Sequence, residues 1–139
     1  MKTQNRQRKG VEMVTVVNKH MVNVSKLNSQ TDRFEYIGRP SILGNPFAVG
    51  RDGTRADVIA KYRLWLWRAL KTDDAIRRRI WVLAKLHMEG VHVHLACWCK
   101  PKSCHGDVIR SAVLWAAEQA TERREKGGSH AEKGGSHAE

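Results

Sequence analysis

The sequence has no long apolar run, no glycine-rich nucleotide-binding fingerprint and few cysteines. A membrane-spanning helix needs roughly 20 consecutive apolar residues, and no segment approaches that length. The basic N-terminus lacks the apolar core of a secretory signal. Neither G-x-x-x-x-G-K-[ST] nor G-x-G-x-x-G is present, so the standard phosphate and dinucleotide loops are excluded. The three cysteines lie close together, which is a poor disulfide framework and indicates a reducing cytoplasm.

What is present suits one domain of 139 residues, of which 41% are hydrophobic and 28% are charged. We expect a flexible basic tail over residues 1–10 and a single folded domain over residues 11–125. Residues 126–139 read KGGSHAE twice in tandem. This composition cannot form a core, so we expect the repeat to be disordered.

The net charge of +11 is concentrated in one stretch, residues 61–85, which hold eight basic and two acidic residues. Tryptophans are interleaved with these charges, and such a mixture is typical of surfaces that bind nucleic acid. The candidate contacts are Arg63, Arg68, Arg77, Arg78 and Arg79. The alternative interpretation is a solvated helix face with the tryptophans Trp65, Trp67 and Trp81 packed against the core.

The hydrophobic pattern predicts strands and helices in alternation. The expected strands are 13–17, 34–37 and 91–99, with a further short strand at 21–24, and the expected helices are 54–70, 75–88 and 104–118. This order predicts an α/β fold, a small Rossmann-like three-layer domain with a short, largely parallel sheet. Ligands of such folds bind at the carboxyl ends of strands, and two unusual loops follow predicted strands here.

The first loop, residues 38–47, is rich in glycine and proline, which permit or fix unusual backbone conformations. A rigid loop with an arginine, a serine and exposed amides suits a phosphate or carboxylate. Its candidate ligand-binding residues are Gly38, Arg39, Ser41, Gly44 and Asn45. The alternative interpretation is a purely structural turn.

The second loop, residues 97–107, allows three interpretations. Cys97, Cys99, Cys104 and His105 form a candidate tetrahedral zinc site. Alternatively, Cys104 is a nucleophile activated at a helix N-terminus, or His105 and Asp107 form an acid–base pair. In the third interpretation, Cys97 and Cys99 are small core residues and Asp107 is a helix-start acid.

Both loops carry a family resemblance. The segments Y-I-G-R-P-S-I-L-G-N-P-F (36–47) and L-A-C-W-C-K-P-K-S-C-H-G-D (95–107), together with residues 55–66, resemble a bacterial and phage family called domain of unknown function 4326. The resemblance extends over about residues 14–117. It implies a one-domain α/β protein in which the matching loop residues belong to one shared site: Gly44, Asn45, Pro46, Cys97, Cys99, Cys104, His105, Gly106 and Asp107.

Two functional hypotheses follow. In the first, a cytoplasmic α/β protein binds, and in one version processes, a phosphorylated nucleoside-type ligand between the two loops. Arg39 and the loop amides hold the anion, Asn45 recognises a polar edge of the ligand, and His105 with Asp107 transfers protons. In the second, a zinc-stabilised basic interaction module of phage or mobile-element type binds nucleic acid or a host protein.

Overall fold

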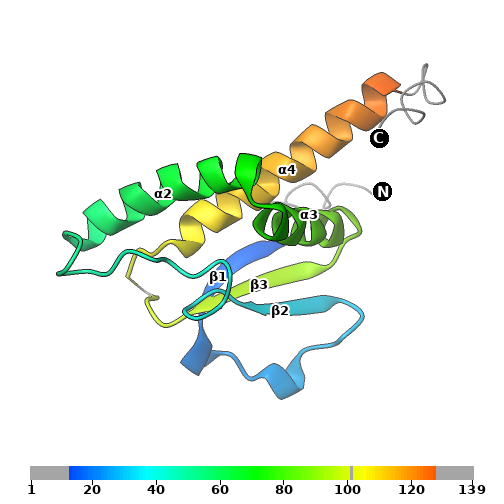
Figure 1. Ribbon diagram of the computed structural model, residues 1–139. Helices are drawn as coiled ribbons and strands as arrows, with labels where there is room; N and C mark the ends of the chain where they lie inside the picture. Colours follow the sequence, from blue (N-terminus) through cyan, green and yellow to red (C-terminus); the bar gives the residue numbers. More distant parts are fainter. Residues whose placement is uncertain (1–12, 101, 128–139) are drawn as a thin grey trace.

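Three strands and three α-helices make up the part of the chain that the computed structural model describes, residues 13–100 and 102–127 (Figure 1). Two short 3-10 helices join the first two strands. The bounds in chain order are β1 Val14–Asn18, η1 Lys19–Met21, η2 Val24–Lys26, β2 Asp32–Tyr36, α2 Arg55–Thr72, α3 Asp74–Met88, β3 His92–Cys97 and α4 Gly106–Gly127.

The sheet has β3 at its centre, in the order β1-β3-β2, and both pairs of neighbours are parallel. Val14 pairs with Val93 across one ladder, and Asp32 pairs with His92 across the other. Parallel pairing puts the carboxyl ends of all three strands at one edge. The prediction of an α/β fold with a largely parallel sheet is therefore confirmed.

The short strand predicted at 21–24 is wrong, because two asparagine side chains turn this segment into 3-10 helices. Asn18 Oδ1 accepts a hydrogen bond from the backbone N–H of His20 at 2.8 Å, and Asn23 Oδ1 accepts one from the N–H of Ser25 at 3.1 Å. Such local bonds satisfy the backbone without a partner strand. Because residues 21, 22 and 24 are apolar, the sequence pattern resembles a strand instead.

The helices begin where the capping residues predict. Thr54 and Asp57 form a reciprocal capping box at the start of α2, and Asp73 accepts two backbone N–H bonds at the start of α3. Helix α4 begins at Gly106, slightly later than predicted, and continues to Gly127. Helix α4 thus includes the first two residues of the predicted C-terminal tail, while residues 1–10 and 128–139 of the predicted tails lie outside the described residues. None of the described helices is both long and apolar enough to cross a membrane.

Helices α2, α3 and α4 lie together on one side of the sheet (Figure 1). Helix α4 packs on β1 and β3, α3 packs on β3, and α2 packs against α3 and α4. Along β3, Val93, Leu95 and Cys97 are buried, while His92 and His94 on the opposite face are partly exposed. The Rossmann-like three-layer arrangement is not confirmed, since that prediction needs helices on both faces of the sheet.

The tryptophans of the basic stretch belong to the packing of the helices. Trp65, Trp67 and Trp81 are partly buried against the core. Trp67 meets the ring of Trp115 edge to face, with centroids 5.1 Å apart. The ring centroids of Trp65 and Tyr62 are 5.3 Å apart, and Tyr62 is fully buried. These contacts fit the packing interpretation of the tryptophans.

One buried hydrogen bond ties the first loop to α2. The Tyr62 hydroxyl donates to the Leu43 carbonyl at 2.7 Å, and both side chains are buried. We expect Tyr62→Phe to lower the free energy of unfolding by about 1–3 kcal/mol, because the buried carbonyl loses its partner. Urea unfolding measures the change. Tyr36→Phe is the matched control, since its hydroxyl lies near the surface, and equal losses in the two variants would contradict this role of Tyr62.

Candidate functional site

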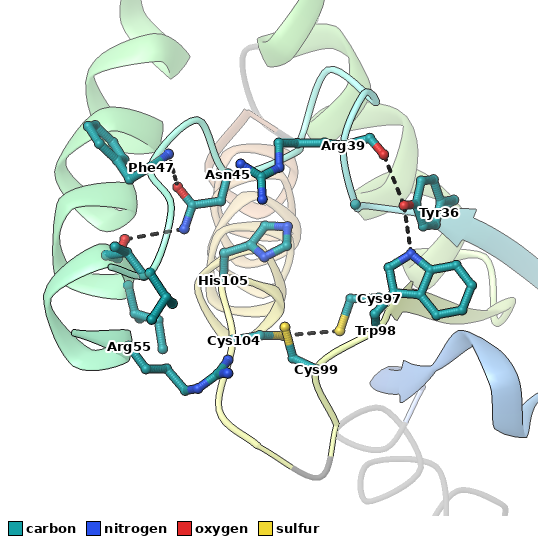
Figure 2. A pocket seen from close by; sticks show the side chains of 14 residues that line it. Tyr36, Arg39, Asn45, Phe47, Arg55, Cys97, Trp98, Cys99, Cys104 and His105 are labelled. Atoms are coloured by element: carbon teal, nitrogen blue, oxygen red, sulfur yellow. Dashed lines mark hydrogen bonds between the residues drawn. The ribbon is translucent and has the colours of Figure 1, made fainter. Parts of the chain in front are cut away.

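The loops after β2 and β3 meet over a cavity of ≈ 310 Å³ at the carboxyl edge of the sheet (Figure 2). The first residues of α2 complete its wall. The lining residues are Tyr36, Gly38, Arg39, Asn45, Phe47, Val49, Arg55, Val58, Ile59, Cys97, Trp98, Cys99, Cys104 and His105. The structure thus brings residues of both predicted loops to one place.

Asn45 links the first loop to α2. Its Oδ1 accepts the backbone N–H of Phe47 at 2.9 Å, and its Nδ2 donates to the Val58 carbonyl at 3.3 Å. The protein itself therefore engages both ends of the amide. Although Asn45 lines the cavity, its visible role is to position the loop.

The glycines of the first loop allow close approach of the chain to itself. A Cβ atom at Gly44 would lie 3.1 Å from the Arg39 Cα and from the Ser41 carbonyl oxygen. A Cβ at Gly38 would lie 2.3 Å from the Tyr36 hydroxyl. Gly44 and Ser41 are not among the lining residues, and the buried Ser41 Oγ has no hydrogen-bond partner in the described part of the chain. Gly44 and Ser41 therefore support the conformation of the loop and do not form part of the cavity wall.

Two arginines supply positive charge to the cavity. Arg39 is exposed, and Figure 2 shows its guanidinium beside His105. Arg55, the first residue of α2, donates from Nη1 to the Ser103 carbonyl at 3.2 Å and so reaches the second loop. Arg55 is not among the site residues predicted from the sequence. The available signal was its place at the predicted start of a helix.

Tyr36 and Trp98 form an aromatic wall at one side of the cavity, and the sequence does not predict them as site residues. Trp98 Nε1 donates to the Tyr36 hydroxyl at 2.9 Å, and that hydroxyl donates to the Arg39 carbonyl at 3.0 Å. The two rings are nearly perpendicular, with centroids 6.4 Å apart. Trp98 is 48% exposed, and Lys19 Nζ lies 5.1 Å from its ring centroid. Alternation along the strand predicts this outward direction for Trp98, opposite to Cys97.

His105 is the buried polar side chain of the site, with 6% of its surface exposed. Its Nε2 donates to the Ile37 carbonyl at 2.7 Å, which fixes the proton on that nitrogen. Burial lowers the pKa of His105, and the nearby Arg39 charge acts in the same direction. The ring is therefore neutral at pH 7. Its Nδ1 keeps a lone pair, for which the described residues supply no hydrogen-bond donor.

Asp107 lies outside the cavity. Its carboxylate is about half exposed, and Oδ1 lies 3.8 Å from Lys100 Nζ. It lines a separate, more open hollow together with Arg55, Arg63 and Ser103. Within the described residues no hydrogen bond joins Asp107 to His105, so the predicted acid–base pair is not assembled.

The three cysteine sulfurs form one group within 4.8 Å of one another. The sulfurs of Cys97 and Cys104 are 3.2 Å apart, and the N–H of Gly106 donates to Cys104 Sγ at 3.2 Å. His105 is outside this group, because neither of its ring nitrogens lies within 4.8 Å of all three sulfurs, and its Nε2 is bonded to the Ile37 carbonyl. The structure therefore assembles three of the four predicted zinc ligands.

The two close thiols differ in acidity. Hydrogen bonds with Cys104 and with the backbone N–H groups of Cys99 and Lys100 lower the pKa of Cys97 to about 6. The same pairing with Cys97, together with burial, raises the pKa of Cys104. Either sulfur can be the donor in the bond between them, and these directions favour Cys97 as the thiolate of the pair, while Cys104 is the nucleophile predicted from the sequence.

The basic stretch stands apart from the cavity. None of its five candidate arginines is among the cavity's lining residues. Arg77 pairs with Asp74 on its own helix, and Arg79 pairs with Glu35 of β2 at 3.3 Å. The remaining three, Arg63, Arg68 and Arg78, are exposed.

A thiol titration checks the assignment of the thiolate. We expect thiolate ultraviolet absorbance to rise with pH in a first step centred at about 6, because hydrogen bonds stabilise the Cys97 anion. Cys97→Ser should abolish this step. Cys99→Ser, which keeps a hydroxyl to hydrogen-bond Cys97 in place of the Cys99 thiol, is the control and should retain the step. A first step that survives in Cys97→Ser would place the thiolate elsewhere.

Comparisons with known proteins place this geometry in a family. The chain matches the family model "Domain of unknown function (DUF4326)" over residues 21–115, which include both loops and the whole cavity lining. It is 34% identical over 79 residues to the "Uncharacterized 12.4 kDa protein in nrdA-td intergenic region" of Enterobacteria phage T4. That match covers 55% of this chain and 64% of the phage protein. No solved structure matches the chain.

Proposed function

The chain belongs to the DUF4326 family, and we propose that it binds a phosphorylated nucleoside-type ligand in the cavity between its two loops. One observation carries the proposal: two arginines, an aromatic wall and a neutral histidine converge on a single cavity of ≈ 310 Å³. Small-molecule sites combine apolar walls with a few convergent polar groups in this way.

The phosphate would lie against Arg39 and Arg55, which come from different elements. Arginine presents a planar fork of donors that matches the oxygens of a phosphate. Helix α4 starts at Gly106, directly after two lining residues, so the positive end of its dipole adds to the attraction. The two arginines and the start of α4 would thus bind the phosphate, although the chain has no glycine-rich phosphate-loop motif.

The base would lie against the wall formed by Tyr36 and Trp98. The hydrogen bond between these two side chains fixes the Trp98 ring, which is large and still half exposed. A fixed aromatic face stacks on any nucleobase, and such stacking is sequence-tolerant. Phe47, Val58 and Ile59 supply apolar surface on the other side.

His105 would accept a hydrogen bond or a proton from the ligand. Its Nδ1 has a lone pair, and its Nε2–H is anchored to the backbone. If the ligand is processed, this nitrogen is the base, and Asp107 takes no direct part. The free thiols in the site suit a reducing compartment, so we place the protein in the cytoplasm.

Binding of nucleoside monophosphates tests the proposal. We expect the full chain to bind at least one of the common ribo- or deoxyribonucleoside monophosphates in isothermal titration calorimetry, and to bind the matching nucleoside more weakly. Arg39→Ala and Arg55→Ala should each raise Kd about tenfold, since each removes a charge-assisted hydrogen bond worth about 1.5 kcal/mol.

Arg78→Ala is the matched control, because it removes an exposed arginine far from the cavity lining. It should leave Kd unchanged. Equal losses in all three variants would mean general attraction of anions to a basic protein. No heat of binding with any monophosphate would overturn the proposed ligand class.

The cysteine group supports a second candidate function, a zinc-stabilised basic module that binds nucleic acid or a host protein. Its three thiols suit Zn²⁺, and the amide hydrogen bonds at Cys97 stabilise the thiolate that zinc requires. The exposed arginines Arg63, Arg68 and Arg78 would contact the phosphates of a nucleic acid. In this candidate, the fourth zinc ligand comes from outside the group.

Elemental analysis tests this candidate. We expect about one zinc per chain after purification without chelator, and a lower thermal midpoint after chelation. Cys97→Ser and Cys104→Ser should lose the metal. His105→Ala should keep it, since the histidine lies outside the sulfur group. A metal-free protein whose unfolding is insensitive to chelator would contradict the zinc module.

A further inference from the structure

A second group of metal-ligand side chains lies on the face of the sheet opposite α3 and α4. It consists of Asp32 on β2 with His92 and His94 on β3. One ligand atom from each of the three lies within 4.8 Å of the others. None of the three lines the cavity, so the proposed function leaves them unexplained.

The sheet itself places these residues together. His92 and His94 are two residues apart on one strand, so both side chains point to the same face, while Val93 between them points into the core. Asp32 is directly opposite His92 in the parallel ladder. All three positions are on strands, which hold metal ligands more rigidly than loops do.

The side-chain contacts bring the nitrogen and oxygen atoms close. His94 Nε2 lies 2.8 Å from Asp32 Oδ1, and His92 Nε2 lies 2.9 Å from Thr15 Oγ1. The two imidazole rings stack with centroids 3.9 Å apart and planes at 19°. The side chains of His94 and Asp32 are 12% and 20% exposed, so the group is mostly shielded but can be reached from solvent.

We propose that Asp32, His92 and His94 bind a divalent transition-metal ion. Two imidazoles and one carboxylate on one face are a donor set for zinc and its neighbours in the first transition row. The ion takes the place of the proton shared by Asp32 and His94. The ring proton of His94 then moves to Nδ1, and the two ligand atoms separate by a few tenths of an ångström to admit metal bonds of about 2.0–2.2 Å.

Thr15 and water would complete the coordination shell. Thr15 lies on β1, and its hydroxyl already contacts His92. A metal here would cross-link β1, β2 and β3 on the face opposite the α3 and α4 helices. This site has nitrogen and oxygen donors alone, whereas the cavity group has sulfur donors, so the two can be told apart by their chemistry.

Titration of the full chain with Co²⁺ tests the site, because cobalt bound to thiolates shows a strong near-ultraviolet charge-transfer band that nitrogen and oxygen ligands do not give. We expect about one equivalent of Co²⁺ to bind without that band, and to raise the thermal midpoint. Asp32→Asn and His92→Asn should each lose this equivalent and the metal-dependent rise.

His20→Asn is the control, since it removes an exposed histidine outside the group and should keep the equivalent. The tail histidines His130 and His137 are present in every variant and cancel in the comparison. Because Asp32→Asn also changes the hydrogen bond to His94, the His92→Asn variant provides the test if the aspartate variant unfolds. Unchanged binding without the thiolate band in His92→Asn, or cobalt binding only with that band, would overturn the proposal.

Discussion

The ladder of hydrogen bonds from β3 to both of its neighbours is the constraint on which the rest of the structure depends. Parallel pairing on both sides brings the ends of β2 and β3 to one edge, although their loops are far apart in sequence. The cavity exists because those two loops must leave the sheet at the same place. Every lining residue from Tyr36 to His105 owes its position to this edge, either directly or through the start of α2.

The loops are held there by contacts that leave little freedom. Tyr62 binds the carbonyl of Leu43, Asn45 binds the carbonyl of Val58, and Arg55 binds the carbonyl of Ser103. Each bond joins α2 to a loop. At the start of α4, a Cβ atom on Gly106 would lie 2.7 Å from Val16 Cγ1 and 3.0 Å from Ile37 Cδ1, so only glycine lets this helix approach the sheet. The site is therefore fixed before any ligand arrives, which reduces the entropy lost on binding.

The sequence predicts the long elements and both loops, because hydrophobic period, capping residues and glycine-proline clusters act locally. It fails at residues 21–24, where local hydrogen bonds to the Asn18 and Asn23 side chains override the apolar pattern. It also fails where distant contacts decide, since the Ile37 carbonyl engages Nε2 of His105. Tyr36 and Trp98 lie within the two family-matching segments, but nothing local assigns them or Arg55 to a cavity, so their meeting there depends on tertiary structure. The pairing of Asp32 with His92 likewise follows from a strand order that local periodicity does not specify.

Alternation along β3 separates two kinds of chemistry within one strand. On the core side the strand ends at Cys97, whose thiolate is stabilised by a neighbouring thiol and by backbone amides. On the other side it presents His92 and His94, which meet a carboxylate and a hydroxyl. Soft sulfur donors and harder nitrogen and oxygen donors favour different partners. Because no side chain belongs to both groups, a ligand in the cavity and an ion on the face opposite α3 and α4 would both stabilise the β2–β3 pair without competing for a single side chain.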